Sequence, residues 1–113
     1  MDLETLTAAM REFVQSKGWI DDSSVKPQSH RNLAISLVLE ASEVLEHFQW
    51  GEESAAPEAL AEELADVLLY LLQLADINGV DLGQEVMKKL EKNQERDWPA
   101  PTADNSAGKV KRA

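Results

Sequence analysis

Two segments of this 113-residue chain each place a pair of carboxylates three residues apart beside an apolar helical stripe. The segment LVLEASEVLEHF holds Glu40 and Glu43, and LAEELADVLLYL holds Glu63 and Asp66. At about 100° per residue, both acids of a pair lie along one edge of their helix. If the two stripes pack together, four carboxylates converge at one rim, and their mutual repulsion raises pKa values and costs stability unless a cation lies among them. A ligand set made only of oxygens suits Mg²⁺, with Mn²⁺ as a possible substitute.

The same spacing also fits a chain without a metal site. Acids three residues apart are common on solvated helix faces, and two short amphipathic helices can match by chance. On that interpretation the protein is a non-catalytic helical dimer that acts as a binding or scaffold module, and Glu43→Gln leaves its metal affinity unchanged. A di-iron carboxylate bundle is disfavoured, because it normally needs a Glu-x-x-His motif on each of two helices and this chain has none.

A second group of side chains, near the C-terminal end of the helical pattern, could bind phosphate. Lys89, Asn93 and Arg96 follow one another at spacings of four and three residues and therefore share a helix face. Two cations and an amide could hold a phosphate chain. The alternative is that these cations are only the basic last turn that a helix dipole favours.

The three tryptophans, Trp19, Trp50 and Trp98, all fall at expected helix ends or in loops. Each of these side chains can cover the edge of a small hydrophobic core or offer a flat surface on which a base stacks. The two histidines, His30 and His47, are expected to be structural or surface groups, because neither has a partner at a spacing typical of ligands.

Apolar periodicity and capping residues predict an all-α fold with no strand. The expected helices cover about residues 3–17, 30–50, 57–77 and 82–96. On the second and third helices the expected apolar stripes are Leu33, Leu37, Ala41, Val44, Leu45 and Phe48, and Leu60, Leu64, Val67, Leu68, Leu71 and Leu74. Residues 99–113 are rich in Pro, Ala, Ser and Gly and have little to bury, so we expect a flexible C-terminal tail.

Composition limits the partners of the chain. The formal net charge of -10 repels nucleic acid and anionic membranes, so neither is an expected partner. No apolar run approaches the roughly 20 residues that span a bilayer, and the first residues do not resemble a signal peptide, so a cytoplasmic location is expected. A chain this short gains from a partner that covers its core, which predicts a homo-oligomer.

Taken in order, these segments resemble the MazG-like, all-α nucleoside triphosphate pyrophosphohydrolases. The resemblance covers about residues 3 to 99, and the four motifs in one order make it specific. The motifs are Glu40-Ala-Ser-Glu43, Phe48-Gln49-Trp50, Glu63-Leu-Ala-Asp66 with Tyr70, and Lys89 with Asn93 and Arg96. Within the family, the chain is most similar to the small enzymes that act on deoxynucleoside triphosphates, including the dCTP pyrophosphatases.

The resemblance implies a four-helix MazG-like bundle, assembled as an intertwined homodimer or a dimer of dimers, with a catalytic domain over residues 1–98. It implies Mg²⁺-dependent hydrolysis of a deoxynucleoside triphosphate to the monophosphate and pyrophosphate, for nucleotide-pool housekeeping. Glu40 or Glu43 is the expected catalytic proton acceptor. A dUTP or phosphoribosyl-ATP hydrolase of the same superfamily is the alternative. The implied metal ligands are Glu40, Glu43, Glu63 and Asp66, and the implied substrate-binding residues are Trp19, Trp50, Tyr70, Lys89, Asn93 and Arg96.

The chain departs from the family pattern mainly at the nucleoside end. Relatives commonly read Asn-x-x-Arg-Tyr-Pro where this chain has an extra residue before Trp98, and His47 stands where an apolar residue is usual. The loop from Asp21 to Ser29 is also longer than in the dCTP enzymes. The resemblance therefore bears more directly on the reaction than on the preferred base.

Overall fold

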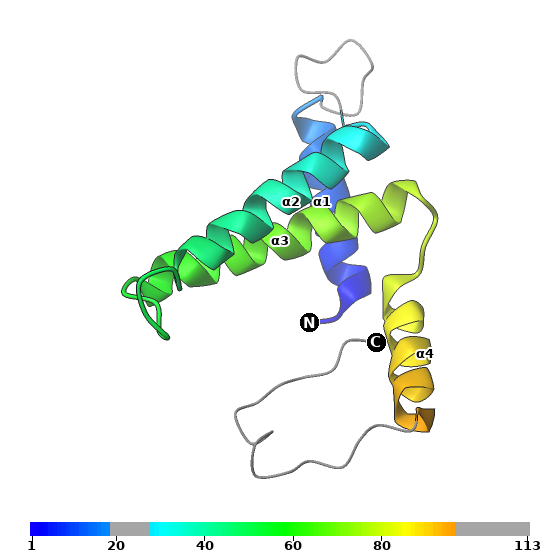
Figure 1. The fold of residues 1–113 in the computed structure, drawn as a ribbon. Coiled ribbons are helices and arrows are strands. Elements are labelled where there is room, and N and C mark those ends of the chain that lie inside the picture. Colours follow the sequence, from blue (N-terminus) through cyan, green and yellow to red (C-terminus); the bar gives the residue numbers. More distant parts are fainter. Residues whose placement is uncertain (19–27, 97–113) are drawn as a thin grey trace. The chain divides into compact units, whose positions relative to one another are not determined.

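The computed structural model describes residues 1–18 and 28–96, which form four helices and, within those ranges, no strand (Figure 1). This confirms the predicted all-α class. The helices are α1 (Leu3–Ser16), α2 (His30–Glu46), α3 (Pro57–Ile77) and α4 (Leu82–Glu95). The chain divides into two compact units, Met1–Asp81 and a second that begins at Leu82, so α4 is described by itself. Trp19, Trp98 and the predicted tail lie outside the described residues.

Local signals in the sequence set most of the helix ends. The Asp2 carboxylate accepts a hydrogen bond from the Thr5 N–H at 2.8 Å, and the Ser29 hydroxyl accepts one from the Asn32 N–H at 3.1 Å. α3 begins at Pro57, whose missing N–H costs nothing at a first helical position. It ends where Gly79 takes a φ of 66°, which lets the following N–H reach back into the last turn.

α2 ends at Glu46, and the prediction that this helix continues to residue 50 is wrong. The Phe48 N–H donates to the Leu45 carbonyl at 3.0 Å, a three-residue step that tightens the last turn and stops the α-helical pattern. His47 turns its ring toward the chain that follows, where it contacts Ser54. The FQW motif therefore lies in the α2–α3 connection instead of on the helix.

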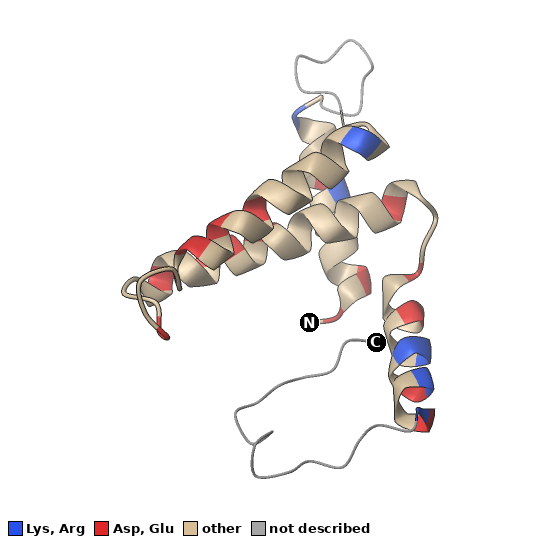
Figure 2. Cartoon of the chain, viewed as in Figure 1, with Lys and Arg blue, Asp and Glu red and all other residues tan. Residues whose placement is uncertain are grey.

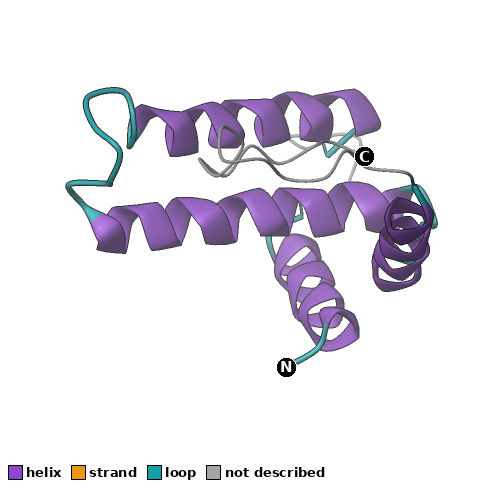
Figure 3. Cartoon of the chain, turned by 60° about the horizontal axis from the view of Figure 1, so that its bottom comes forward, coloured by secondary structure: helices purple, strands orange, loops and turns teal. Residues whose placement is uncertain are grey.

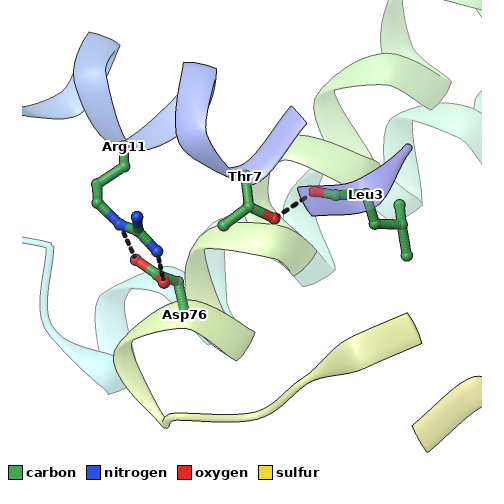
Figure 4. A network of polar contacts seen from close by, with 4 residues as sticks. All are labelled: Leu3, Thr7, Arg11 and Asp76. Atoms are coloured by element: carbon green, nitrogen blue, oxygen red, sulfur yellow. Dashed lines mark hydrogen bonds and ion pairs between the residues drawn. The ribbon is translucent and has the colours of Figure 1, made fainter. Parts of the chain in front are cut away.

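α2 and α3 pack side by side and run in opposite directions, while α1 packs across α3 (Figures 1 and 3). Two polar contacts support these pairings. Arg11 on α1 donates through Nε and Nη2 to the two carboxylate oxygens of Asp76 on α3, at 3.1 and 2.5 Å (Figure 4). The Nδ1 atom of His30, at the start of α2, lies 3.0 Å from Oδ1 of Asn78, which caps α3.

The hydrophobic core of the described residues is small. Only Met10, Val14, Leu33 and Leu72 are fully buried apolar side chains among them. Many large apolar side chains stay exposed, including Val38 at 65% and Leu45 at 69%. Within residues 1–18 and 28–96, no helix is long and apolar enough to cross a membrane.

The inward face of α2 differs from the predicted apolar stripe. The buried and half-buried positions follow steps of four and three residues, and this row includes two polar side chains: Leu33, Leu37, Glu40, Val44 and His47. Three members of the expected stripe, Ala41, Leu45 and Phe48, are exposed instead. α3 shows the same arrangement, because Glu63 is half-buried while Leu64 is 51% exposed. Glu40 and Glu63 thus lie within the packed faces and not at their edges.

Candidate active site

The predicted carboxylates of α2 and α3 lie within electrostatic range of one another. Figure 2 shows the acidic residues of these helices gathered toward the α2–α3 connection. Burial raises the pKa of Glu40, and a hydrogen bond with Glu43 raises it further, because two carboxyl groups can share such a bond only through a proton. Repulsion from Glu43, Asp66 and Glu63 adds to the same pKa shift. Three of the acids expected from the sequence therefore act on the fourth, Glu40, and burial is the largest cause of its raised pKa.

Part of this cluster fits a divalent cation. The Glu40 Oε2 atom is buried and has no hydrogen-bond partner in the structure, and such an oxygen is costly unless something positive approaches it. Carboxylate oxygens are also the donors that Mg²⁺ and Mn²⁺ prefer. Among the described residues, however, no three acidic or histidine side chains are grouped closely enough to hold an ion as they stand. The donor chemistry fits the metal, and binding requires the side chains to draw closer together.

His47 joins this cluster, which the sequence did not predict. Its ring is only 12% exposed, its Nε2 atom contacts the Glu63 carboxylate, and its Nδ1 atom lies 2.8 Å from the Ser54 hydroxyl. The expectation that His47 has no partner at a spacing typical of ligands was based on spacing along α2 alone. Its partner, Glu63, lies on α3. The available signal was its position in the row of four- and three-residue steps that also contains Glu40.

A pocket of about 330 Å³ opens between α1 and α3. This volume lies at the lower end of the range typical of small-molecule sites. Apolar groups from both helices line most of it, and Asp66 and Tyr70 reach it from α3. The lining includes Leu6, Met10, Phe13, Asp66, Tyr70 and Gln73. The structure therefore puts two residues that were predicted for different tasks, metal binding and nucleoside binding, around one pocket.

Gln73 supplies a polar group to the wall of this pocket. It is the one buried polar residue of the described chain, at 7% exposure, and its Nε2 donates to the Gln28 Oε1 atom at 2.5 Å. A few convergent polar groups in an otherwise apolar pocket are typical of sites that fix the orientation of a ligand. Neither glutamine was singled out from the sequence, because a lone glutamine carries no motif.

Within residues 1–18 and 28–81, one further predicted substrate-binding residue, Trp50, does not line this pocket. Trp50 lies in the α2–α3 connection and is 91% exposed, and Trp19 is outside the described residues. Lys89 and Asn93 lie on α4 and Arg96 directly follows it, at the predicted spacing, and they belong to the second compact unit. The roles of all these residues stay predictions.

Comparison with known proteins places the chain in a family. Residues 35–111 match the MazG-like family. The dCTP pyrophosphatase 1 proteins of Mus musculus and Homo sapiens are each 37% identical over 118 aligned positions, which cover 95% of this chain. The chain spans 65% of the length of these relatives. A crystal structure of a pyrophosphatase from Archaeoglobus fulgidus DSM 4304 superposes with a TM-score of 0.67 at 38% identity, over 87% of this chain and 93% of that one. The chain thus belongs to the MazG-like family.

Proposed function

We propose that this protein is a nucleotide pyrophosphohydrolase, which cleaves a deoxynucleoside triphosphate between its α and β phosphorus atoms to give a monophosphate and pyrophosphate. The printed names of its relatives, a dCTP pyrophosphatase and a pyrophosphatase, support this reaction. The ordered acidic motifs of α2 and α3 support it independently.

The position of Asp66 carries the proposal. This residue lines the pocket between α1 and α3, and its charge also acts on Glu40 at the α2–α3 interface. A bound nucleotide needs an apolar space for its base beside a strongly negative cluster that attracts a cation for its phosphates. Asp66 connects two such regions in one structural unit.

We assign the carboxylates of Glu40, Glu43, Glu63 and Asp66 to the binding of Mg²⁺, for which Mn²⁺ can substitute. When bound, the cation supplies neutralising charge to phosphate oxygens and lowers the pKa of a coordinated water. Glu40 or Glu43 accepts the proton of the attacking water. α2 and α3 contribute rigidity, because helices that pack along their length hold these side chains more firmly than a loop would.

Lys89, Asn93 and Arg96 are assigned to the leaving pyrophosphate. Their spacing presents two cations and an amide along one helix face, which suits several oxygens of one phosphate chain. Tyr70, at the pocket, and the tryptophans Trp19 and Trp50 are assigned to the nucleoside.

The preferred substrate is proposed to be dCTP or a close analogue, on the strength of the relatives' names. Steady-state hydrolysis of dCTP, dATP, dTTP, dGTP, dUTP and phosphoribosyl-ATP, with Mg²⁺ or EDTA, tests this directly. The highest kcat/KM for dCTP would support the proposal, whereas a preference for dUTP or phosphoribosyl-ATP would favour the alternatives within the superfamily. Hydrolysis that persists in EDTA would contradict the metal assignment.

A homodimer or homotetramer is proposed as the working form. Support comes from the small core and from the exposed apolar side chains of α2, among them Ile35, Val38 and Leu39, which a second copy could cover. Trp50, which is exposed here, could then contribute to a site on a neighbouring subunit. Light scattering coupled to size-exclusion chromatography would give the mass of two or four chains, and the mass of a single chain would contradict the proposal.

The rival function, a scaffold module, predicts that the acids contribute nothing beyond solubility. A cytoplasmic location and the lack of nucleic-acid or membrane partners stay predictions from the composition.

A further inference from the structure

His47 connects the end of α2 to the first turns of α3 through a chain of hydrogen bonds. The Ala56 N–H donates to the Ser54 hydroxyl at 3.0 Å, and that hydroxyl lies 2.8 Å from Nδ1 of His47. The Nε2 atom on the far side of the ring contacts the Glu63 carboxylate. The side chains of Ser54, His47 and Glu63 are all partly buried, and the ring of His47 is less exposed than the side chain of Glu63, at 12% against 26%.

The direction of these hydrogen bonds follows from the groups themselves. An ionised carboxylate can only accept, so the Nε2 atom of His47 must carry a proton and donate it to Glu63. A backbone N–H can only donate, so the Ser54 oxygen accepts from Ala56. In the tautomer that carries its only proton on Nε2, Nδ1 accepts a hydrogen bond from the Ser54 hydroxyl. Each member of the chain fixes the orientation of the next one.

Glu63 is the terminus of this chain and a member of the acidic cluster at the same time. Its charge acts on Glu40, whose Oε2 atom is buried without a partner. The contact with His47 occupies one carboxylate oxygen of Glu63, Oε2, and leaves the other oxygen to a different partner. The acids need to draw together to hold an ion. A side chain that already restrains one of these carboxylates reduces the conformational freedom that is lost when the ion binds.

We propose that His47 is a positioning residue, which orients the Glu63 carboxylate for binding of a divalent cation through the hydrogen bond that it donates. The inference rests on the proposed function, because it takes Glu63 as a metal ligand. In metal sites, loss of the group that is hydrogen-bonded to a ligand typically weakens metal affinity by about 10- to 100-fold.

The test measures the affinity of the full-length protein for Mn²⁺ alone, without nucleotide, by electron paramagnetic resonance of the free ion. His47→Leu removes both hydrogen bonds, and His47→Gln keeps a donor for Glu63. His30→Leu is the matched control, because His30 also joins α2 to α3, through Asn78, at the other end of the helix pair. The free energy of unfolding in EDTA is measured for each variant, so that a loss of fold is recognised separately from a loss of metal binding.

We expect His47→Leu to weaken Mn²⁺ binding by about 10- to 100-fold, His47→Gln to restore most of the affinity, and His30→Leu to leave it unchanged. Ser54→Ala, which keeps the ring, should lower the affinity by less than His47→Leu does. Binding by His47→Leu that equals or exceeds that of the wild type would overturn the proposal, since the histidine would then be a purely structural tie or a competitor for Glu63. A loss that His47→Gln does not restore would overturn it too, because the donated hydrogen bond would not be its cause.

The failure of this inference is distinguishable from the failure of the proposed function. If the wild type hydrolyses nucleotides and binds Mn²⁺ while His47→Leu binds the ion equally well, only the role of His47 is wrong. If the wild type neither binds Mn²⁺ nor hydrolyses any triphosphate, both are wrong.

Discussion

Replacing Glu40 with methionine should make the protein more stable when no metal is bound. The Glu40 Oε2 atom is buried without a hydrogen-bond partner, and three further carboxylates repel the charge of this group. Methionine has nearly the same length and helix propensity and carries no charge, so it keeps the packing of the stem. A buried polar group without a partner costs about 1–3 kcal/mol, and removal of Glu40 should raise the free energy of unfolding in EDTA by an amount of that order.

The same substitution should abolish stabilisation by Mg²⁺. For the wild type, Mg²⁺ at 100 times its dissociation constant adds about 2.7 kcal/mol to the free energy of unfolding. A chain of this size gains about 4 °C in Tm for each kcal/mol, so the metal should raise the wild-type Tm by about 10 °C. Glu40→Met should start about 4–12 °C higher in EDTA and gain almost nothing from Mg²⁺.

The advantage of Glu40→Met in EDTA should also grow with pH. The pKa of Glu40 is raised above its ordinary value of 4.5 in the folded state. A carboxyl group whose folded pKa is raised contributes stability that is fully present below the unfolded pKa and is lost as pH rises through the folded pKa. The wild type should therefore lose stability relative to the variant as pH rises from about 4.5, until Glu40 is fully ionised.

Thermal melts in EDTA and in Mg²⁺, followed by circular dichroism between pH 5 and 8, measure all three effects. Glu46→Met is the control, because Glu46 is an exposed acid at the end of the same helix. That variant should keep the wild-type response to both Mg²⁺ and pH. A Glu40→Met protein that is less stable than the wild type in EDTA, or a wild type that Mg²⁺ does not stabilise, would refute the reasoning.

Three further predictions concern the reaction and the fold. Glu43→Gln should reduce Mg²⁺-dependent turnover by at least about 100-fold while the circular dichroism spectrum stays unchanged, and full turnover in this variant would refute the assignment of Glu43 to the catalytic site. Gln73→Leu, in the pocket wall, should raise KM for the preferred nucleotide and lower the ratio of its kcat/KM to that of other nucleotides, which a substrate panel would measure. The same ratio in the variant and the wild type would exclude Gln73 from base recognition. Ser29→Ala removes the cap of α2 and should lower the free energy of unfolding by about 1 kcal/mol in urea titrations, and an unchanged midpoint would show that this cap does not matter.

Local signals predicted most of the fold. Gly18 and Gly79 follow the expected first and third helices, and both take positive φ values, 69° and 66°, at those ends. Asp2 and Pro57 are residue types that favour helix starts, and both are found at the start of a helix. Such signals act through backbone geometry within a few residues, so they can be read without knowledge of the packing.

The inner face of the helix pair could not be predicted in the same way. An apolar stripe drawn from residue types put Leu45 inside and treated His47 as a structural or surface group, whereas Leu45 is 69% exposed and His47 is mostly buried. The reason is that His47 is stabilised by groups on the following loop and on α3, which are contacts that periodicity along α2 does not report. The pocket beside Tyr70 escaped prediction for the same reason, since α1 supplies half of its wall.

The most direct test of the account is identification of the products by phosphorus NMR after incubation of the protein with dCTP and Mg²⁺. The account predicts signals of dCMP and pyrophosphate, and their disappearance when EDTA replaces the metal. Inorganic phosphate with dCDP would contradict cleavage between the α and β phosphorus atoms, and an unchanged triphosphate spectrum across all the nucleotides tested would contradict the assignment of this chain as a nucleotide pyrophosphohydrolase.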